Sequence, residues 1–318
     1  MNPVAGRVAV FGSLNMDLVV RLARFPSPGE TVAGQGFATV PGGKGANQAA
    51  ACARLGVATA LVGRVGDDPH GEALLSALRG SGVDVSGVAR TPGVPTGTAH
   101  IQVTAGGENT IVVVPGANHA LDDTDLERLE RALEGAAVLM LQLELPLPQV
   151  LAAARRAAAR GVPVLLDPAP AQPLPDELWA LCTLVTPNEH EAEVLTGLSV
   201  ATAAEVRAAA DAMRARGARE VIVKRGARGA DWTDGETWLH VPAHRVEAVD
   251  TVAAGDAFGG GVAAALASGL TRAQALAWGA ATAAVAVTRP GAQTSLPTRA
   301  EMLRMLEAGA GASPGGHN

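Results

Sequence analysis

The sequence of 318 residues has few aromatic residues, few cysteines and no long apolar run. Tyrosine is absent, and aromatic residues make up only 3%. The two cysteines, Cys52 and Cys182, lie far apart and form no Cys-x-x-Cys or Cys/His pattern. We therefore predict neither a disulfide framework nor a zinc site, and a reducing cytoplasm fits. Charged residues or glycine interrupt every alanine-rich run, and the N-terminus has no signal-peptide pattern, so we expect no membrane span and no signal peptide.

An excess of positive charge is also missing. The formal net charge is −6 at pH 7, and the arginines are scattered close to acids, as in LERLERALE at 126–134. A general basic face for nucleic acid or for a membrane surface is therefore excluded. Hydrophobic residues, in contrast, reach 48%, which is enough for the core of one large domain.

Short β-rich runs alternate with alanine-rich helical runs along the chain. We predict strands at 7–12, 59–66, 136–144, 162–168, 183–188 and 220–226. We predict helices at 45–56, 70–82, 147–160, 202–216, 255–268 and 271–288. This order is typical of an α/β fold with a mostly parallel central sheet and helices on both faces. With no internal repeat and no linker, we expect a single domain over 1–318, of which 308–318 is a disordered tail.

Two regions interrupt the alternation, at 16–40 and 96–118. Both contain β-like runs separated by glycine, proline and asparagine, which favours hairpins. Because polar residues flank both regions, we expect the hairpins to form a small second sheet over one edge of the main sheet, acting as a lid or an interface. The alternative is a pair of ordinary surface hairpins.

Polar residues stand where several of the predicted strands end. They are Asn15, Asp17, Glu144, Asp167 and Asn188. Ligands bind beyond the carboxyl ends of parallel strands, so these residues predict a cleft along one edge of the sheet. The alternative is that polar residues simply favour the loops between elements.

The stretch PGGKGANQAA at 41–50 places a glycine pair directly before a helix. Gly42 and Gly43 allow close approach of the backbone, the helix start offers free N–H groups, and Lys44 and Asn47 add a charge and an amide. The spacing is not that of a Walker P-loop. A glycine turn before a helix is common, so the stretch alone leaves function open.

Two further stretches have both a functional and a structural interpretation. In TPNEHEAEVL at 186–195, Asn188 and Glu191 would share one face of a helix and hold waters around Mg²⁺, or else Asn188 is a helix cap. The stretch VIVKRGARGADW at 221–232 reads as strand, glycine turn and strand. It would let a nucleotide lie against the backbone, or it is a plain hairpin.

The stretch DTVAAGDAFGGG at 250–261 combines an acid with a small-residue turn at the start of a helix. Ala253, Ala254 and Gly255 offer backbone N–H groups to an anion. Asp256 beside them would take a proton from an attacking hydroxyl in phosphoryl transfer, or it only caps the helix. The glycines at 259–261 are poor helix formers, which indicates that something packs very close to them.

These stretches resemble the PfkB, or ribokinase-like, family of sugar kinases. GGKGANQA at 42–49 is similar to the N-terminal signature of the family and DTVAAGDAF at 250–258 to its C-terminal signature, and the likeness covers nearly the whole chain. The resemblance implies a ribokinase-like three-layer α/β fold with a β-sheet lid. It also implies ATP-dependent phosphorylation of D-ribose at O5, with Mg²⁺, activation by K⁺ and a homodimer formed through the lid. The alternatives are a related kinase for 2-deoxyribose, a nucleoside or another sugar, and a sugar-binding regulator without catalysis.

By resemblance, the site residues fall into groups that share a ligand. The sugar would be held by Asn15, Asp17, Gly42, Gly43, Lys44, Asn47 and Glu144. Asp256 would be the base, and Ala253, Ala254 and Gly255 the anion hole. ATP and its Mg²⁺ would be held by Asn188, Glu191, Lys224, Gly226, Gly229, Gly255 and Ala280. The K⁺ site would comprise Asp250, Val252, Ala286, Arg289, Gly291 and Ser295.

The sequence departs from the family pattern at a few positions. Ala257 and Gly259 replace the usual Thr and Asn of the C-terminal signature, Ala280 stands where His or Asn often meets the adenine, and Lys224 stands where Thr is common. None of these departures removes a residue that the chemistry requires, so the resemblance implies an active enzyme.

Overall fold

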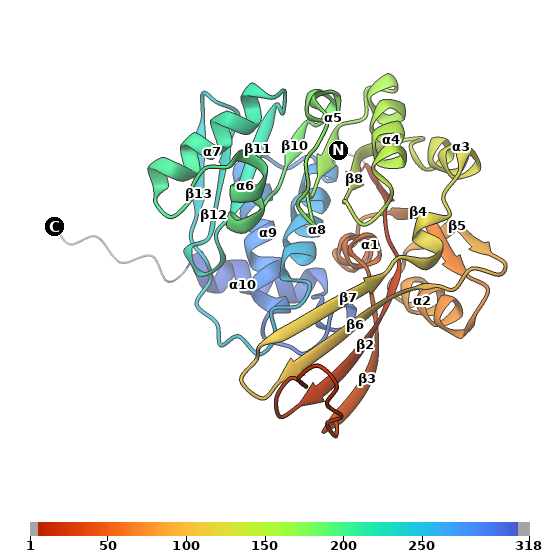
Figure 1. Ribbon diagram of the computed structural model, residues 1–318. Helices are drawn as coiled ribbons and strands as arrows, with labels where there is room; N and C mark the ends of the chain where they lie inside the picture. Colours follow the sequence, from red (N-terminus) through yellow and green to blue (C-terminus); the bar gives the residue numbers. More distant parts are fainter. Residues whose placement is uncertain (1–5, 311–318) are drawn as a thin grey trace.

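A computed structural model describes residues 6–310, and it consists of two β-sheets with helices packed around the larger one (Figure 1). Within these residues, no helix is both long and apolar enough to cross a membrane. The predicted disordered tail at 308–318 lies mostly outside the described residues. Its first residues are helical, because the last helix runs to Ala310.

The larger sheet has nine strands in the order β13-β12-β11-β10-β9-β8-β1-β4-β5. Their bounds are β1 Arg7–Phe11, β4 Thr59–Gly66, β5 Asp84–Thr91, β8 Ala136–Leu141, β9 Val164–Leu166, β10 Leu184–Val185, β11 Glu220–Lys224, β12 Ala230–Thr233 and β13 Trp238–Val241. All neighbouring pairs from β5 to β11 are parallel, whereas β12 and β13 are added antiparallel. The mostly parallel sheet is thus confirmed, and the sequence prediction missed the edge strands β5 and β13.

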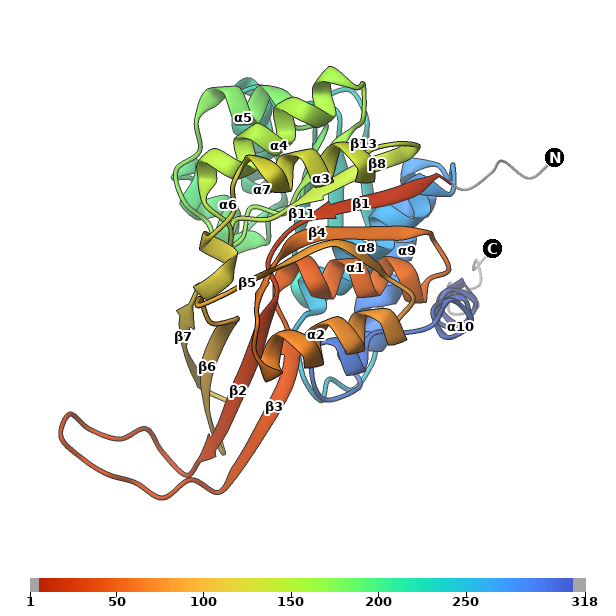
Figure 2. The ribbon, with the colours of Figure 1, turned by 90° about the vertical axis from the view of Figure 1, so that its right-hand side faces the viewer.

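Helices cover both faces of this sheet. Their bounds are α1 Lys44–Arg54, α2 Pro69–Gly80, α3 Asp123–Ala132, α4 Leu147–Ala159, α5 Asp176–Leu181, α6 Glu189–Thr196, α7 Ala203–Ala215, α8 Ala254–Ala267, α9 Arg272–Ala286 and α10 Arg299–Ala310. Figure 2 shows α3, α4, α5 and α7 on one side and α1, α2, α8 and α9 on the other. The alternation along β1 builds both cores, because Val8 and Val10 face one helix layer and Ala9 and Phe11 face the other.

The two predicted hairpins form the second sheet. It has the order β3-β2-β6-β7, with β2 Asn15–Leu22, β3 Gly36–Gly42, β6 Gly97–Thr104 and β7 Asn109–Val114. Each hairpin is antiparallel, and β2 joins β6 in parallel register. This small sheet, which we call the lid, projects from the main body (Figure 2). The predicted second sheet is confirmed.

Two of the three glycines at 259–261 allow α8 to pack closely. A Cβ on Gly260 would lie 2.4 Å from the Cβ of Ala51 in α1, and a Cβ on Gly261 would lie 2.6 Å from Oγ1 of Thr282 in α9. Gly259 differs, because its nearest neighbour would be Met140 Cε at 3.7 Å, an ordinary contact. The close packing predicted from this triplet therefore holds for Gly260 and Gly261 only.

Candidate active site

A cavity of about 610 Å³ lies at the carboxyl ends of the parallel strands. Its polar lining residues come from several elements and include Lys44, Asp167, Asn188, Glu191, Lys224 and Asp256. Asp167 follows β9, Asn188 follows β10, and Lys224 is the last residue of β11. The predicted cleft along this edge of the sheet is therefore present, as parallel pairing brings these strand ends together.

A second group of polar side chains lies beside Lys44 and Asp256. Glu144 Oε2 accepts hydrogen bonds from the Ser13 hydroxyl, from Asn15 Nδ2 at 3.3 Å and from the Lys44 backbone N–H at 3.1 Å. Asn47 Nδ2 donates to Asp256 Oδ2 at 2.9 Å. The predicted sugar-binding residues are thus brought together, and Lys44 and Asp256 connect them to the cavity.

Asp17 is a buried carboxyl group on β2, close to two other acids. Burial, which is the largest cause, and the nearby charges of Glu144 and Asp256 together raise the pKa of Asp17 to about 7. A carboxyl group of this kind carries its charge in part of the population near neutral pH.

The glycine pair before α1 is required by its surroundings. A Cβ on Gly42 would lie 2.3 Å from Asp17 Oδ2, so any side chain there would displace the carboxyl group. Gly43 has φ +90°, and a Cβ on it would lie 2.6 Å from the backbone nitrogen of Asn15. The pair therefore allows β3 and α1 to pass close to β2, so that Asn15 and Asp17 can line one site.

Asp256 does not cap α8. The N-cap residue is Ala253, in the left-handed region at φ 59° with no side-chain cap. The Asp256 carboxylate instead accepts hydrogen bonds from Asn47 Nδ2 and from Gln48 Nε2 at 3.1 Å. The pKa of Asp256 is raised to about 6, mainly by burial, which outweighs the lowering by Lys44 and by the hydrogen bond from Asn47; the charges of Asp167 and Glu144 also raise it. The cap interpretation is thus wrong, and the carboxyl group is mostly charged at neutral pH.

The start of α8 presents backbone N–H groups to the cavity. Ala253, Ala254 and Gly255 all line it. The Ala254 N–H is already donated to Thr251 O at 3.2 Å. Among residues 6–310, no partner is found for the N–H groups of Ala253 and Gly255. Such donors at a helix N-terminus attract an anion, although the engaged N–H of Ala254 makes this set smaller than the predicted one.

Asn188 and Glu191 form a capping box at the start of α6. Asn188 Oδ1 accepts the Glu191 N–H at 2.8 Å, and Glu191 Oε2 accepts the Asn188 N–H at 2.7 Å. The cap interpretation is confirmed, yet both residues also line the cavity. In the described part of the chain, Asn188 Nδ2 and Glu191 Oε1 have no hydrogen-bond partner. The pair can therefore cap the helix and face a ligand at the same time.

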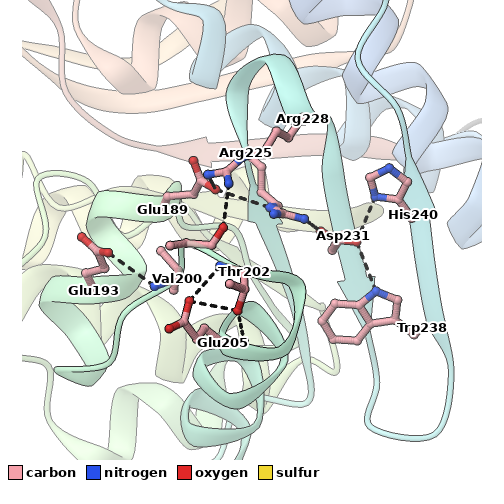
Figure 3. A network of polar contacts seen from close by, with 11 residues as sticks. Glu189, Glu193, Val200, Thr202, Glu205, Arg225, Arg228, Asp231, Trp238 and His240 are labelled. Atoms are coloured by element: carbon pink, nitrogen blue, oxygen red, sulfur yellow. Dashed lines mark hydrogen bonds and ion pairs between the residues drawn. The ribbon is translucent and has the colours of Figure 1, made fainter.

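The predicted glycine turn after β11 lines the cavity with Gly226, Ala227 and Gly229. Figure 3 shows how ion pairs fix it. Arg225 pairs with Glu189 in α6 and with the buried Asp231 in β12, and Arg228 pairs with Glu189 and donates to Ala201 O at 2.7 Å. Asp231 also accepts from Trp238 Nε1 at 3.1 Å and lies 2.9 Å from His240 Nδ1. This network attaches the turn to the residue beside Asn188.

One wall of the cavity is apolar. It is formed by Ala280, Ala283 and Ala284 of α9 and by Val287, which directly follows the helix. These positions have the i, i+3, i+4, i+7 spacing of one helix face. The segment 243–248 lines the cavity as well. Ala280, where the resembled family often has His or Asn, is thus one of the small apolar residues on this wall of the cavity.

The residues predicted for K⁺ lie on two segments, 250–252 and 286–295, and the side chain of Asp250 connects them. Its Oδ1 accepts the Val252 N–H and its Oδ2 accepts the Gly291 N–H, both at 2.9 Å. Ala286 O accepts the Arg289 N–H at 3.2 Å, while the Arg289 side chain pairs with Glu301. Ser295 Oγ donates to Ala292 O at 2.8 Å. Asp250, Val252 and Gly291 are thus brought together, and the Arg289 side chain is occupied elsewhere.

The sequence prediction left several site residues without a role. Ser13 and Gln48 gave no signal, because each stands in an ordinary apolar or helical context. Asp167 was noted at the end of a strand, but its partners were unknown. It is 2% exposed and accepts from Lys224 Nζ at 2.7 Å and from Gln48 Nε2 at 3.0 Å.

In the described residues, no group of three His, Cys, Asp or Glu side chains could hold a metal ion alone.

Comparisons with known proteins agree with this geometry. The family described as pfkB family carbohydrate kinase matches residues 5–299. A ribokinase of Haemophilus influenzae is 41% identical over 300 residues, covering 94% of this chain and 98% of its own. A deoxyribokinase of Salmonella typhi is 39% identical over 252 residues, covering 79% and 82%. The structure of Arabidopsis thaliana ribokinase complexed with ribose and ATP superposes with a TM-score of 0.89, at 34% identity, covering 96% and 99%.

Proposed function

Because the chain belongs to the pfkB family of carbohydrate kinases, we propose that it transfers the γ-phosphoryl group of ATP to O5 of D-ribose. The observation that carries this proposal is the position of Asp256. Its buried carboxylate accepts from Asn47, is close enough to Glu144 for that charge to act on it, and stands in the first turn of α8, whose start carries the free N–H groups. Relatives named ribokinase over nearly the whole chain support ribose as the acceptor.

The proposed reaction is a direct transfer between the two bound substrates. Asp256 takes the proton from O5 of ribose, a bond forms between O5 and the γ-phosphorus, and the bond to the β–γ bridging oxygen breaks to release ADP. Phosphoryl transfer depends mainly on positioning and on neutralising charge. The N–H groups of Ala253 and Gly255, together with the positive end of α8, would stabilise the negative charge of the transferring group.

Asn188 and Glu191 fit a Mg²⁺ ion that travels with ATP. Mg²⁺ keeps most of its waters in such sites and needs few protein ligands. The absence of a three-acid cluster from the described residues agrees with this mode. Glu191 offers its free carboxylate oxygen to the waters of the ion, and Asn188 Nδ2 can donate to a phosphate oxygen, because Asn188 Oδ1 already accepts the Glu191 N–H. When bound, the ion would neutralise phosphate charge.

We also place an activating K⁺ at the segments that Asp250 connects. Each carboxylate oxygen of Asp250 accepts one N–H group and keeps lone pairs for a cation. The proposed ligands besides Asp250 come from Val252, Ala286, Arg289, Gly291 and Ser295, several of them through backbone carbonyl groups. The site would act through the Asp250–Val252 turn, which leads directly into Ala253.

A cytoplasmic location agrees with Cys52 and Cys182 both being free and buried.

The substrate assignment predicts the outcome of a sugar panel. Release of ADP is measured with D-ribose, 2-deoxy-D-ribose, D-fructose and a nucleoside, each with and without K⁺ at constant ionic strength. We expect ribose to give the highest kcat/KM and K⁺ to raise turnover. If 2-deoxyribose is preferred, as the deoxyribokinase relative would suggest, the ribose assignment is wrong while the kinase assignment holds. Absence of turnover with every sugar would contradict both.

We propose that the lid mediates a homodimer. Five large apolar side chains on it are exposed: Phe37, Ile111, Val112, Val113 and Val114. Phe37, 68% exposed, lies on the edge strand β3, and the other four, with Val112 64% exposed, lie on the opposite edge strand β7. Exposed apolar edge strands readily pair with another chain. We expect light scattering to give the mass of a dimer for the wild type and of a monomer for Val112→Lys. Val194→Lys, which changes an exposed apolar residue of α6, is the control. A monomeric wild type would contradict the proposal.

A further inference from the structure

Lys224 lies where the proposed phosphoryl transfer takes place. It is the last residue of β11, and its backbone N–H is donated to Pro187 O at 2.8 Å, next to Asn188. Its side chain is 12% exposed and lines the cavity. A Cβ built on Gly255 would lie 3.4 Å from Nζ, so the ammonium group is packed against the first turn of α8. The N–H groups of that turn are the proposed anion hole.

The ammonium group is held in place by Asp167. Nζ lies 2.7 Å from Asp167 Oδ1, and the other oxygen of that buried carboxylate accepts from Gln48 Nε2 at 3.0 Å. Gln48 Nε2 is also 3.1 Å from Asp256 Oδ1, and Gln48 Oε1 accepts from Gln142 Nε2 at 2.6 Å. A continuous chain of hydrogen bonds therefore joins Lys224 through Asp167 and Gln48 to the proposed base.

From this arrangement, and on the basis of the proposed function, we infer that Lys224 is a catalytic residue that contacts the transferring phosphoryl group, and that Asp167 positions it. An ammonium group has three N–H donors, so Lys224 can keep its bond to Asp167 and direct the others into the cavity. Its charge then supplements the N–H groups of Ala253 and Gly255. The N–H group between them, that of Ala254, is already donated to Thr251 O. Because Asp167 is buried, water does not compete with its carboxylate for the ammonium group, which therefore stays in place.

The simpler role for Lys224 would be to neutralise Asp167. A buried carboxylate without a partner is costly, and a lysine beside it removes that cost. The two roles make different predictions once both charges are removed. If Lys224 only neutralises Asp167, replacing Lys224 should do no harm once Asp167 is asparagine. If Lys224 contacts the phosphoryl group, replacing Lys224 removes that contact whatever residue stands at position 167.

The test compares Lys224→Met, Asp167→Asn and the double variant with the wild type. We expect Lys224→Met to lower kcat by about 100-fold, the effect of losing one donor to the developing charge, with the KM for ribose unchanged. In the double variant, the melting temperature should recover but kcat should stay as low as in Lys224→Met. Arg155→Met, which breaks an ion pair with Glu177 on the surface, is the control and should keep wild-type kcat.

The role of Asp167 has its own readout. The charge of Asp167 adds to the effect of burial in raising the pKa of Asp256, so Asp167→Asn should move the acidic limb of the kcat profile to lower pH. This shift follows from the charge of Asp167 alone, so its positioning of Lys224 is tested by the rate: Asp167→Asn should lower kcat towards that of Lys224→Met with the KM for ribose unchanged.

Two results would overturn the inference: wild-type kcat in Lys224→Met, or recovery of kcat in the double variant. Failure of the ribose assignment would be visible separately, in the wild type, and the same variants would then be assayed on the sugar that is turned over.

Discussion

Replacing Asp256 with asparagine should lower kcat by about 10²- to 10⁴-fold, the usual contribution of a general base. The variant keeps the volume of the side chain, and its amide oxygen can still accept from Gln48 Nε2. Its amide nitrogen can donate to Asn47 Oδ1, which has no partner among the described residues, once the Asn47 amide turns over, so the fold and the KM for ribose should change little. Steady-state kinetics with ribose and ATP measure both constants. Asp211→Asn, an exposed acid on α7, serves as the control and should keep wild-type turnover.

The pH profile gives the same prediction a second test. Since burial raises the pKa of Asp256 to about 6, protonation should remove the base as the pH falls through that value, and kcat should fall with it. The residual activity of Asp256→Asn should lack this limb. Near-wild-type turnover in the variant, or an unchanged acidic limb, would exclude Asp256 as the base.

Replacing Asp17 with asparagine should weaken ribose binding and stabilise the protein without its substrates. A charged carboxylate accepts two hydroxyl hydrogen bonds, and losing such bonds to a charged group is expected to raise the KM for ribose by about 10- to 100-fold. In the wild type, the KM should rise as the pH falls below about 7, because protonation removes the charge. The variant should show no such rise.

The effect on stability has a definite sign. The pKa of Asp17 is raised above its ordinary value of 3.8 to about 7, so the folded state holds the proton more tightly than the unfolded state. This stabilising contribution is complete below pH 3.8 and is lost as the pH rises through about 7. Asp17→Asn has no charge to bury, so its gain in melting temperature over the wild type should be larger at pH 8 than at pH 5. An equal difference at both values would contradict the raised pKa.

Much of the fold follows from local patterns in the sequence. The alternation of apolar strands and alanine-rich helices predicts the parallel sheet, since each pattern depends only on neighbouring residues. The strands β5 and β13 were missed because they lie at the edges of the sheet and are only partly buried. Helix α5, six residues long, is too short to show a clear period.

The site was only partly predictable, because its contacts join residues far apart in the chain. The sequence alone could not decide whether Asp256 caps a helix, since the deciding partners, Asn47 and Gln48, lie more than 200 positions away. The pair of Lys224 and Asp167 was missed for the same reason, as β9 and β11 meet only through β10. The sequence also could not show that Asn188 both caps α6 and lines the cavity, because the same residues are expected for either role.

The product of the reaction with D-ribose and ATP tests the central claim most directly. Phosphorus and proton NMR of the reaction mixture identify the carbon that carries the new phosphate ester. We predict D-ribose 5-phosphate, with the phosphorus coupled to the protons on C5, formed in equal amount to ADP. An ester at C1, or release of ADP without any sugar phosphate, would contradict the account.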